Sequence, residues 1–265
     1  MVSDADVKER IERLELPFGS AGIDPYGVSK RHLAQAAQLF WKIYHGYFRT
    51  ECHGIEHVPK RGRAMLVANH SGGYAIDACM LVSACFFELE PPRLAQGMAD
   101  AFISELPFLS EWATRVGQVT GLPQHARRLL EDDRLLMVFP EGTRGTAKLY
   151  SERHDLVRFG TGFVRLALET KTPIIPTCVL GGGEAVPTVA NLYRLGKWFG
   201  LPYLPVTPYL FALPLPVKIE IRFGAPIWLE GNGHEDDKQI HGMVELVKAR
   251  IRELIDEGKQ TYRRL

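Results

Sequence analysis

The spacing of hydrophobic residues along this chain predicts strands that alternate with helices. Uninterrupted apolar runs at residues 64–68 and 135–139 are typical of buried strands. Strands that alternate with helices indicate an α/β fold, so we expect a single mixed β-sheet flanked by helices. Further strands are predicted at residues 49–58, 93–98, 173–180 and 217–223.

Helical spacing is clearest towards the two ends of the chain. Residues 4–15 predict a short charged helix, and residues 30–48 carry an apolar stripe that follows Ser29, a residue type that caps helices. Residues 234–265 predict a long amphipathic C-terminal helix. Its apolar side holds Ile240, Met243, Leu246, Val247, Ile251, Leu254 and Ile255. Other helices are predicted at residues 77–88, 101–116, 123–131 and 160–170.

A linker separates the N-terminal helix from the rest of the chain. Residues 16–27 contain Pro17, Pro25 and several glycines, which favour turns over regular structure. We therefore divide the chain into residues 1–28, a charged N-terminal helix with its linker, and residues 29–265, one large domain.

Two segments have the composition of a lipid-facing surface. Residues 39–48 lie on a predicted helix and hold aromatic side chains that suit a membrane interface. Those side chains are Trp41, Tyr44, Tyr47 and Phe48. Residues 198–217 contain five prolines and several aromatics but no charged residue, which excludes a regular helix or a central strand. Packing against the core is the alternative explanation for both segments.

A histidine at the end of a predicted strand is the first candidate for catalysis. Residues 69–73 read Asn-His-Ser-Gly-Gly, and Asp77 follows at the start of an apolar helix. In one continuous helix His70 and Asp77 would lie two turns apart, about 10 Å. A turn at the two glycines instead allows the Asp77 carboxylate to accept one imidazole N–H. The other ring nitrogen is then left as a base.

A second polar motif follows the strand predicted at residues 135–139. Residues 138–148 read Val-Phe-Pro-Glu-Gly-Thr-Arg-Gly-Thr-Ala-Lys. Gly142 and Gly145 let backbone N–H groups approach a ligand, and Arg144 provides a planar guanidinium that suits a phosphate. A polar surface turn is the alternative explanation for this motif taken alone.

Together, the two motifs resemble the paired signature of the glycerol-3-phosphate and lysophosphatidate (lysophospholipid) O-acyltransferase superfamily. That signature consists of a strand-end His with a following Asp and, further along the chain, Phe-Pro-Glu-Gly-Thr-Arg. More similarity, to a bacterial branch near the mono- and diacylglycerol acyltransferases, lies at residues 24–27, 158–163, 173–176 and 201–208. The resemblance covers most of residues 24–230.

One departure concerns the partner of the histidine. The superfamily places the Asp five residues after the His, where this chain has Ala75, whereas Asp77 lies seven residues on. We interpret the two additional residues as a longer loop that contains the glycine pair.

The resemblance implies a role for each motif within an acyltransferase domain of residues 29–265. His70, oriented by Asp77, would take the proton of an acceptor hydroxyl that attacks an acyl thioester. The second motif would bind substrate, with the acceptor phosphate near its Glu-Gly-Thr-Arg run. The residues so assigned are Phe139, Glu141, Gly142, Thr143 and Arg144. The donor would be acyl-CoA or acyl carrier protein, a substrate rather than a bound cofactor.

The activity implied is acyl transfer to a lysophospholipid, with lysophosphatidate as the default acceptor, in phospholipid and glycerolipid biosynthesis. A neutral lipid alcohol such as monoacylglycerol is an alternative acceptor, and a non-catalytic lipid-binding protein is an alternative function. A serine esterase is disfavoured, because the chain has no Gly-x-Ser-x-Gly elbow.

Composition limits the classes of partner and cofactor. The chain has 32 basic and 31 acidic residues, a balance that argues against a nucleic-acid-binding protein. Four cysteines, at 52, 79, 85 and 178, form no C-x-x-C pair, and no group of residues has the spacing of a metal site. We therefore expect reduced thiols and no metal.

The sequence shows no segment for secretion or membrane insertion. Residues 1–16 are charged, and no window approaches the roughly 18 apolar residues of a spanning helix. We expect a cytoplasmic protein that is peripheral on the inner face of the membrane, attached through residues 39–48 and 198–217.

Overall fold

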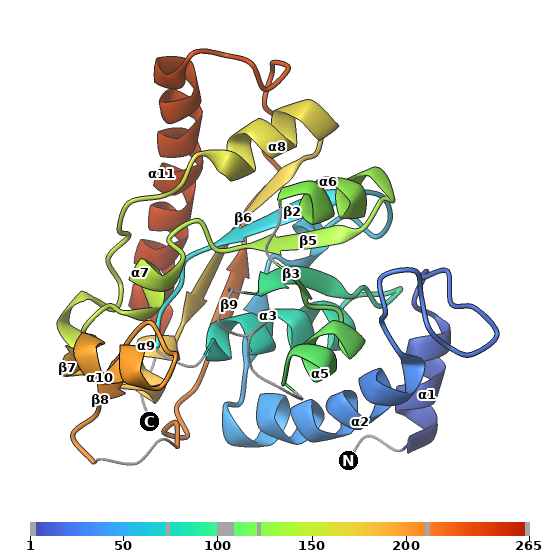
Figure 1. Cartoon of the computed structure of the whole chain (residues 1–265), viewed down its shortest axis with the longest axis horizontal. Coiled ribbons are helices and arrows are strands. Elements are labelled where there is room, and N and C mark those ends of the chain that lie inside the picture. Colours follow the sequence, from blue (N-terminus) through green and yellow to red (C-terminus); the bar gives the residue numbers. More distant parts are fainter. Residues whose placement is uncertain (1–3, 73–74, 100–108, 121–122, 210–212, 263–265) are drawn as a thin grey trace.

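A seven-stranded sheet lies at the centre of the chain (Figure 1). The computed structural model describes residues 4–72, 75–99, 109–120, 123–209 and 213–262. Along the sheet, the strands are β1 (Glu51–His53), β9 (Glu220–Phe223), β6 (Ile174–Leu180), β2 (Ala64–Ala68), β5 (Leu135–Val138), β3 (Ala95–Ala99) and β4 (Val119–Thr120). Neighbouring strands run parallel except β6 and β9, which are antiparallel. The sheet is therefore mixed, as predicted.

Strand β2 explains why both faces of the sheet are covered. All of its residues are buried. Ala64, Leu66 and Ala68 belong to the hydrophobic cluster on one face, and Met65 and Val67 belong to the cluster on the other. Because side chains alternate across a strand, a continuous apolar run needs helices on both sides.

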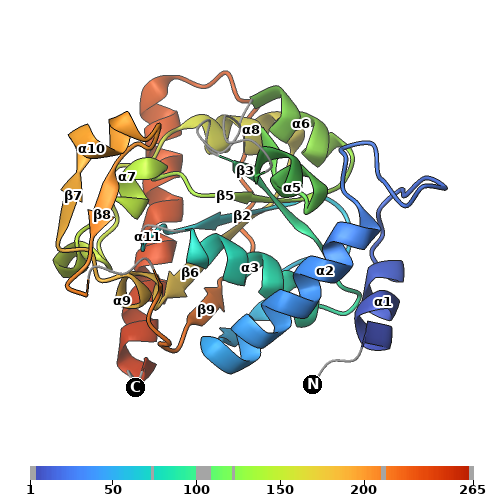
Figure 2. The ribbon, with the colours of Figure 1, turned by 60° about the horizontal axis from the view of Figure 1, so that its bottom comes forward.

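Helices form a layer on each face of the sheet, as Figure 2 shows. One layer contains α1 (Asp4–Glu12), α2 (Lys30–Trp41), α3 (Ile76–Phe87) and α5 (Leu109–Arg115). The other contains α6 (Pro123–Glu131), α8 (Gly162–Thr170) and α11 (Asp237–Thr261). The bounds of β2 and α6 are those predicted. The helix predicted at residues 101–116 is described only from Leu109, because residues 100–108 lie outside the described ranges.

The N-terminal segment joins this core through α1. Val7, Ile11 and Leu14 are buried in the same cluster as α2 and α3. The Arg10 guanidinium also donates to the carbonyl oxygen of Phe86, at the end of α3, at 2.9 Å. A domain boundary at residue 28 stays a prediction.

The helix predicted at residues 30–48 has two parts. Helix α2 ends at Trp41 and continues as a π-helical segment, η1 (Lys42–Tyr47). The wider η1 turn leaves Tyr44 and Phe48 buried in the core. These two aromatic residues therefore cannot face lipid. The prediction of a membrane-facing side chain is wrong for two of the four aromatic residues named in this segment. Ser29 occupies the N-cap position, but its side chain makes no capping hydrogen bond.

Helix α11 closes the second layer along β6 and β9. The Asp236 carboxylate caps it by accepting from the backbone N–H of Gln239 at 2.8 Å. The predicted apolar side is wrong at one position, since Leu246 is exposed and Val244 takes its place in the buried stripe.

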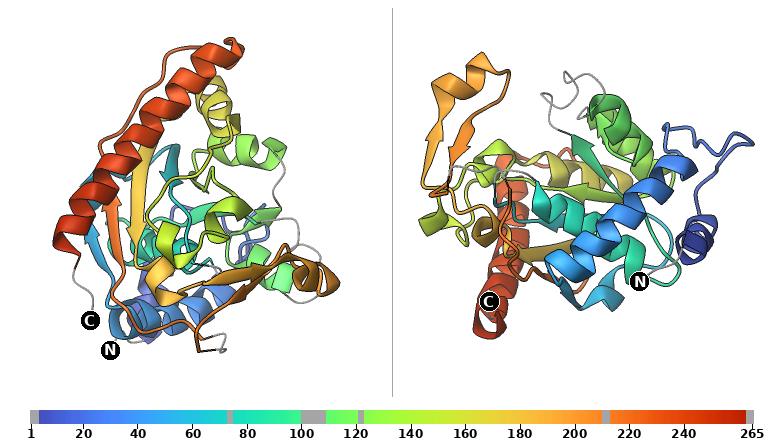
Figure 3. Two further views of the ribbon diagram at one scale, coloured as in Figure 1. Left: turned by 90° about the vertical axis from the view of Figure 1, so that its left-hand side faces the viewer. Right: turned by 90° about the horizontal axis from the view of Figure 1, so that it is seen from below.

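A small two-stranded sheet stands apart from the main sheet. After β6 and α9 (Gly182–Ala185), β7 (Ala190–Leu192) pairs antiparallel with β8 (Leu204–Val206), and α10 (Tyr193–Trp198) lies between them. This β7–α10–β8 unit projects from the body of the molecule (Figure 3). Within the described ranges, no helix combines the length and apolarity needed to cross a bilayer.

Candidate active site

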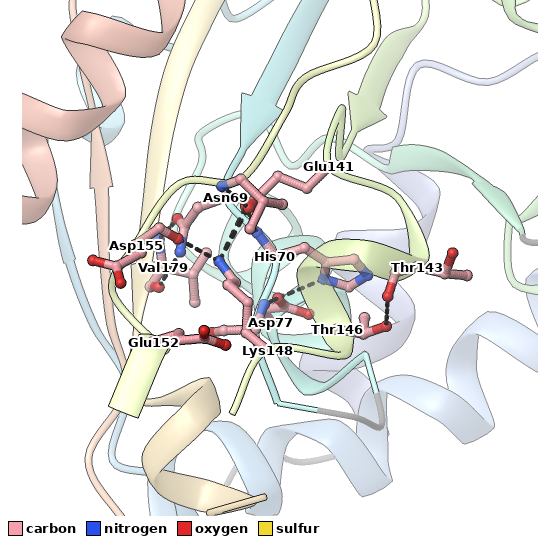
Figure 4. A network of polar contacts seen from close by, with 12 residues as sticks. Asn69, His70, Asp77, Glu141, Thr143, Thr146, Lys148, Glu152, Asp155 and Val179 are labelled. Atoms are coloured by element: carbon pink, nitrogen blue, oxygen red, sulfur yellow. Dashed lines mark hydrogen bonds and ion pairs between the residues drawn. The ribbon is translucent and has the colours of Figure 1, made fainter. Parts of the chain in front are cut away.

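The two sequence motifs meet at the carboxyl ends of neighbouring parallel strands. Strand β2 leads into Asn69 and His70, and β5, its parallel neighbour, leads into Phe139. Loops that follow parallel strands converge at this edge, where α/β proteins place their binding sites. Figure 4 shows side chains of both motifs gathered around His70.

The His70 ring is hydrogen-bonded to Asp77. Its Nδ1 lies 2.6 Å from Oδ2 of Asp77, which also accepts from the backbone N–H of Ser71 at 2.8 Å. Asp77 is fully buried in the first turn of α3, where the helix dipole stabilises a negative charge. A carboxylate at Nδ1 favours the tautomer protonated there, so Nε2 is the basic nitrogen.

Two residues in the described part of the loop between His70 and Asp77 lie in the left-handed region. Gly72 has φ 72° and Ala75 has φ 52°; Gly73 lies outside the described ranges. A Cβ on Gly72 would lie 2.0 Å from the carbonyl oxygen of Gly182, so only glycine fits. The longer spacing between His and Asp is therefore closed by a loop, as expected.

Asn69 fixes the end of β2 to β6. Its Nδ2 donates to the carbonyl oxygen of Val179 at 3.0 Å, and its Oδ1 accepts from the backbone N–H of Val179 at 2.8 Å. The side-chain amide thus reproduces the pairing of a strand, and the residue before His70 is held as firmly as the sheet.

Two residues of the second motif lie against His70. The ring of Phe139 stacks on the imidazole, with centroids 4.3 Å apart and planes tilted by 23°. Gly145 approaches the base of the same side chain, since a Cβ at this position would lie 2.7 Å from Cβ of His70. A larger residue at 145 would displace the histidine.

Glu141 is buried beneath His70 with its carboxylate occupied by protein donors. Oε1 accepts from the backbone N–H of His70 at 2.8 Å, and Oε2 accepts from that of Val157 at 2.9 Å. Nζ of Lys148 lies 3.3 and 3.1 Å from the two oxygens and also donates to the carbonyl oxygen of Asp155 at 2.7 Å. We propose that Glu141 positions His70, a role different from the substrate binding predicted for it.

The rest of the second motif forms a turn near the surface. The short helix α7 (Thr143–Thr146) follows Gly142, whose φ of 56° and ψ of −150° require glycine. The hydroxyl of Thr146 donates to the carbonyl oxygen of Thr143 at 3.0 Å. Arg144 is exposed and has no hydrogen-bond or ion-pair partner among the residues that the structure describes.

Arg153, which follows Lys148 as the next cation along the chain, is held by a buried carboxylate. Nε of Arg153 lies 2.7 Å from Oε1 of Glu184, and Nε2 of His154 lies 3.0 Å from the same oxygen. Burial would raise the pKa of Glu184, but its contacts with His154 and Arg153 outweigh burial and lower the pKa to about 2. Arg153 and Lys148 are thus both neutralised by buried carboxylates, in contrast to the exposed Arg144.

Comparison with protein families gives a match to the family described as Acyltransferase over residues 49–180, a range that includes both motifs. The chain belongs to the acyltransferase family. The crystal structure of the 1-acyl-sn-glycerophosphate (LPA) acyltransferase PlsC from Thermotoga maritima matches with a TM-score of 0.59, over 87% of this chain and 81% of that one. At 16% sequence identity, this likeness concerns the fold.

Curated relatives of this acyltransferase chain come from bacteria and vertebrates. An uncharacterized protein of Mycobacterium tuberculosis is 37% identical over 218 residues, which cover 79% of this chain and 61% of the relative. A human protein named DGAT1/2-independent enzyme synthesizing storage lipids is 26% identical over 223 residues, 82% of this chain and 63% of the relative. The chain therefore spans about three fifths of the length of these relatives.

Two supporting residues of the acyltransferase site were not singled out from the sequence. Lys148 could have been predicted as the partner of Glu141, because a glutamate that is buried just after a strand needs a cation buried with it. For Asn69 the indication in the sequence is weaker, since a side-chain amide that follows a strand can extend the hydrogen bonding of that strand.

The tight loop after His70 yields a first prediction. Gly72→Ala should destabilise the protein more than Gly62→Ala, because both glycines have a left-handed φ but a Cβ on Gly62 meets no atom within 4 Å. The backbone strain common to both should cost about 1–2 kcal/mol. The clash with Gly182 should add about 1–3 kcal/mol for Gly72 alone. Urea unfolding measures the difference; equal losses would contradict the close contact.

The buried pair beneath His70 yields a second prediction. Lys148→Met should cost about 3–5 kcal/mol of unfolding free energy, because it leaves the Glu141 carboxylate buried and unpaired. Adding Glu141→Gln should recover part of this loss in a double-mutant cycle. The control is Lys259→Met, which removes an exposed ion pair with Asp256 and should cost at most about 1 kcal/mol. Additive losses at 141 and 148 would contradict the coupling.

Proposed function

We propose that this protein transfers a fatty acyl group from a thioester, on coenzyme A or acyl carrier protein, to the hydroxyl of a lipid. The observation that carries the proposal is the hydrogen bond between His70 Nδ1 and Asp77 at the edge of the sheet, with the second motif packed against the same histidine. A histidine oriented in this way is a general base.

The proposed reaction uses one proton carrier. Nε2 of His70 removes the proton from the acceptor hydroxyl, whose oxygen attacks the thioester carbonyl carbon. The resulting tetrahedral intermediate expels the thiolate as the carbon–sulfur bond breaks. The imidazolium then returns the proton to the sulfur. The products are an ester and a free thiol, and the Asp77 carboxylate stabilises the imidazolium in between.

A phosphate-bearing acceptor, with lysophosphatidate as the first choice, is the substrate class that we propose. Its support is the guanidinium of Arg144, which is exposed and has no partner among the described residues, in the motif whose Phe139 packs on His70. A neutral acceptor such as monoacylglycerol is the second candidate, because the human relative is named for the synthesis of storage lipids. We further propose that the enzyme is peripheral on the cytoplasmic face of a membrane, where such acceptors reside.

His70→Ala should reduce acyl transfer by on the order of 100-fold or more, because it removes the general base. Asp77→Asn should also reduce the rate, since an amide cannot hold the required tautomer. Thiol release from acyl-CoA, measured with and without acceptor, reports the activity. The control is His241→Ala, which changes an exposed histidine on α11.

Retention of more than about a tenth of the activity in His70→Ala would refute the assignment of the base. Thiol release that does not depend on an acceptor would indicate hydrolysis. A wild-type protein that binds lipid but releases no thiol with any acceptor would be a non-catalytic lipid-binding protein.

Arg144→Ala should distinguish the two acceptor classes. Loss of a charge-assisted contact should raise the KM for a phosphate-bearing acceptor by about 10–150-fold and leave kcat/KM for a neutral acceptor unchanged. Arg252→Ala, at an exposed position of α11, is the matched control. An unchanged KM for lysophosphatidate would remove Arg144 from the acceptor site and favour monoacylglycerol.

A further inference from the structure

We infer that the β7–α10–β8 unit docks the enzyme onto an anionic lipid surface. This inference rests on the proposed function, because an enzyme with a lipid acceptor must reach a bilayer. The unit carries a concentration of large exposed hydrophobic side chains, with Trp198 78% and Phe199 57% exposed. The others are Leu192, Tyr193 and Leu195, together with Val189 directly before β7.

The unit presents these side chains on a folded frame. Tyr203 is buried, and a Cβ on Gly196 would lie 2.5 Å from Cα of Tyr203, so α10 sits directly on the backbone that leads into β8. The rings of Trp198 and Phe199 lie beside one another, with centroids 4.9 Å apart. Since Tyr203 faces inwards, the aromatic side chains of the unit that are able to enter a lipid surface are Tyr193, Trp198 and Phe199.

The charges of the unit fit anionic lipid. Arg194 and Lys197 lie on α10, and both are exposed. Residues 185–219 contain no Asp or Glu. Aromatic and aliphatic side chains interleaved with basic ones are typical of segments that lie in the headgroup region of anionic membranes. Association with a second copy of this chain would not require a surface that carries basic residues and no acidic ones.

The alternative surface at residues 39–48 is poorer. Tyr44 and Phe48 are buried, and Trp41 packs edge-on against Phe87 with ring centroids 5.1 Å apart. Leu39 and Tyr47 are the large hydrophobic side chains exposed there in the described structure. The unit therefore offers the larger apolar surface.

Hydrogen bonds connect the unit to the second motif. Nδ2 of Asn191, on β7, donates to the carbonyl oxygen of Ala147 at 2.6 Å. Beside it, the backbone N–H of Tyr150, just after the motif, donates to the carbonyl oxygen of Thr188, just before β7, at 2.8 Å. Docking through the unit would thus hold the turn that follows Gly142 next to the lipid surface, where an acceptor headgroup is presented.

The test is co-sedimentation with vesicles of phosphatidylcholine alone or mixed equally with phosphatidylglycerol. Wild type should bind the mixed vesicles, and Trp198→Ser with Phe199→Ser should weaken binding at least about tenfold. Arg194→Gln with Lys197→Gln should weaken binding to the mixed vesicles by about fivefold per charge and leave binding to neutral vesicles unchanged. The matched controls change exposed residues outside the unit and should bind as wild type. They are Trp228→Ser with Leu246→Ser, and Lys238→Gln with Arg252→Gln.

Activity separates this inference from the proposed function. With a short-chain acceptor dispersed below its micelle concentration, the unit variants should turn over thioester at the wild-type rate. With acceptor embedded in vesicles, the turnover rate of the unit variants should fall in proportion to their loss of vesicle binding. Vesicle binding can be measured even if no acceptor is ever acylated, so failure of one proposal leaves the other tested.

Three results would overturn the inference. The first is wild type that stays in the supernatant with anionic vesicles at low salt. The second is binding by the Trp198 and Phe199 variant equal to wild type. The third is a stable dimer, seen by light scattering without lipid, that the same variant converts to monomer, since the surface would then belong to self-association.

Discussion

The position of His70 depends on the buried carboxylate of Glu141. That carboxylate accepts a hydrogen bond from the backbone N–H of His70, in the first motif. It also pairs with the ammonium of Lys148, at the far end of the second motif. Charge-assisted bonds of this kind are strong away from water, and a buried carboxylate that loses its cation is strongly destabilising. Segments that are distant in sequence are therefore assembled as one unit.

Two acidic residues hold the histidine in complementary ways. Glu141 fixes its backbone, and Asp77 fixes the direction and tautomer of its ring, while Phe139 covers one face of that ring. Little freedom is left to the imidazole, as the proposed role in proton transfer requires. Arg144, by contrast, is exposed and is held by none of these contacts.

Much of the fold follows from the sequence because uninterrupted apolar runs, such as that of β2, need cover on both faces. The contact between His70 and Asp77 was likewise predictable, since a glycine turn was the way to bring them together. Periodicity could not reveal the π-helical turn that buries Tyr44, because a widened turn changes which side chains share a face. Nor could it show that Tyr203 faces inwards, since an irregular, proline-rich segment has no period from which to read its faces.

The pairing of Asn69 with Val179 bears on how insertions in this region would be tolerated. Together with Glu141, it secures the histidine from outside the loop that leads to Asp77. The loop can thus gain or lose residues without shifting His70, provided that it still returns a carboxylate to Nδ1. The number of residues between a His and an Asp is then a poor guide to whether the two side chains act together. The geometry of chain closure decides it.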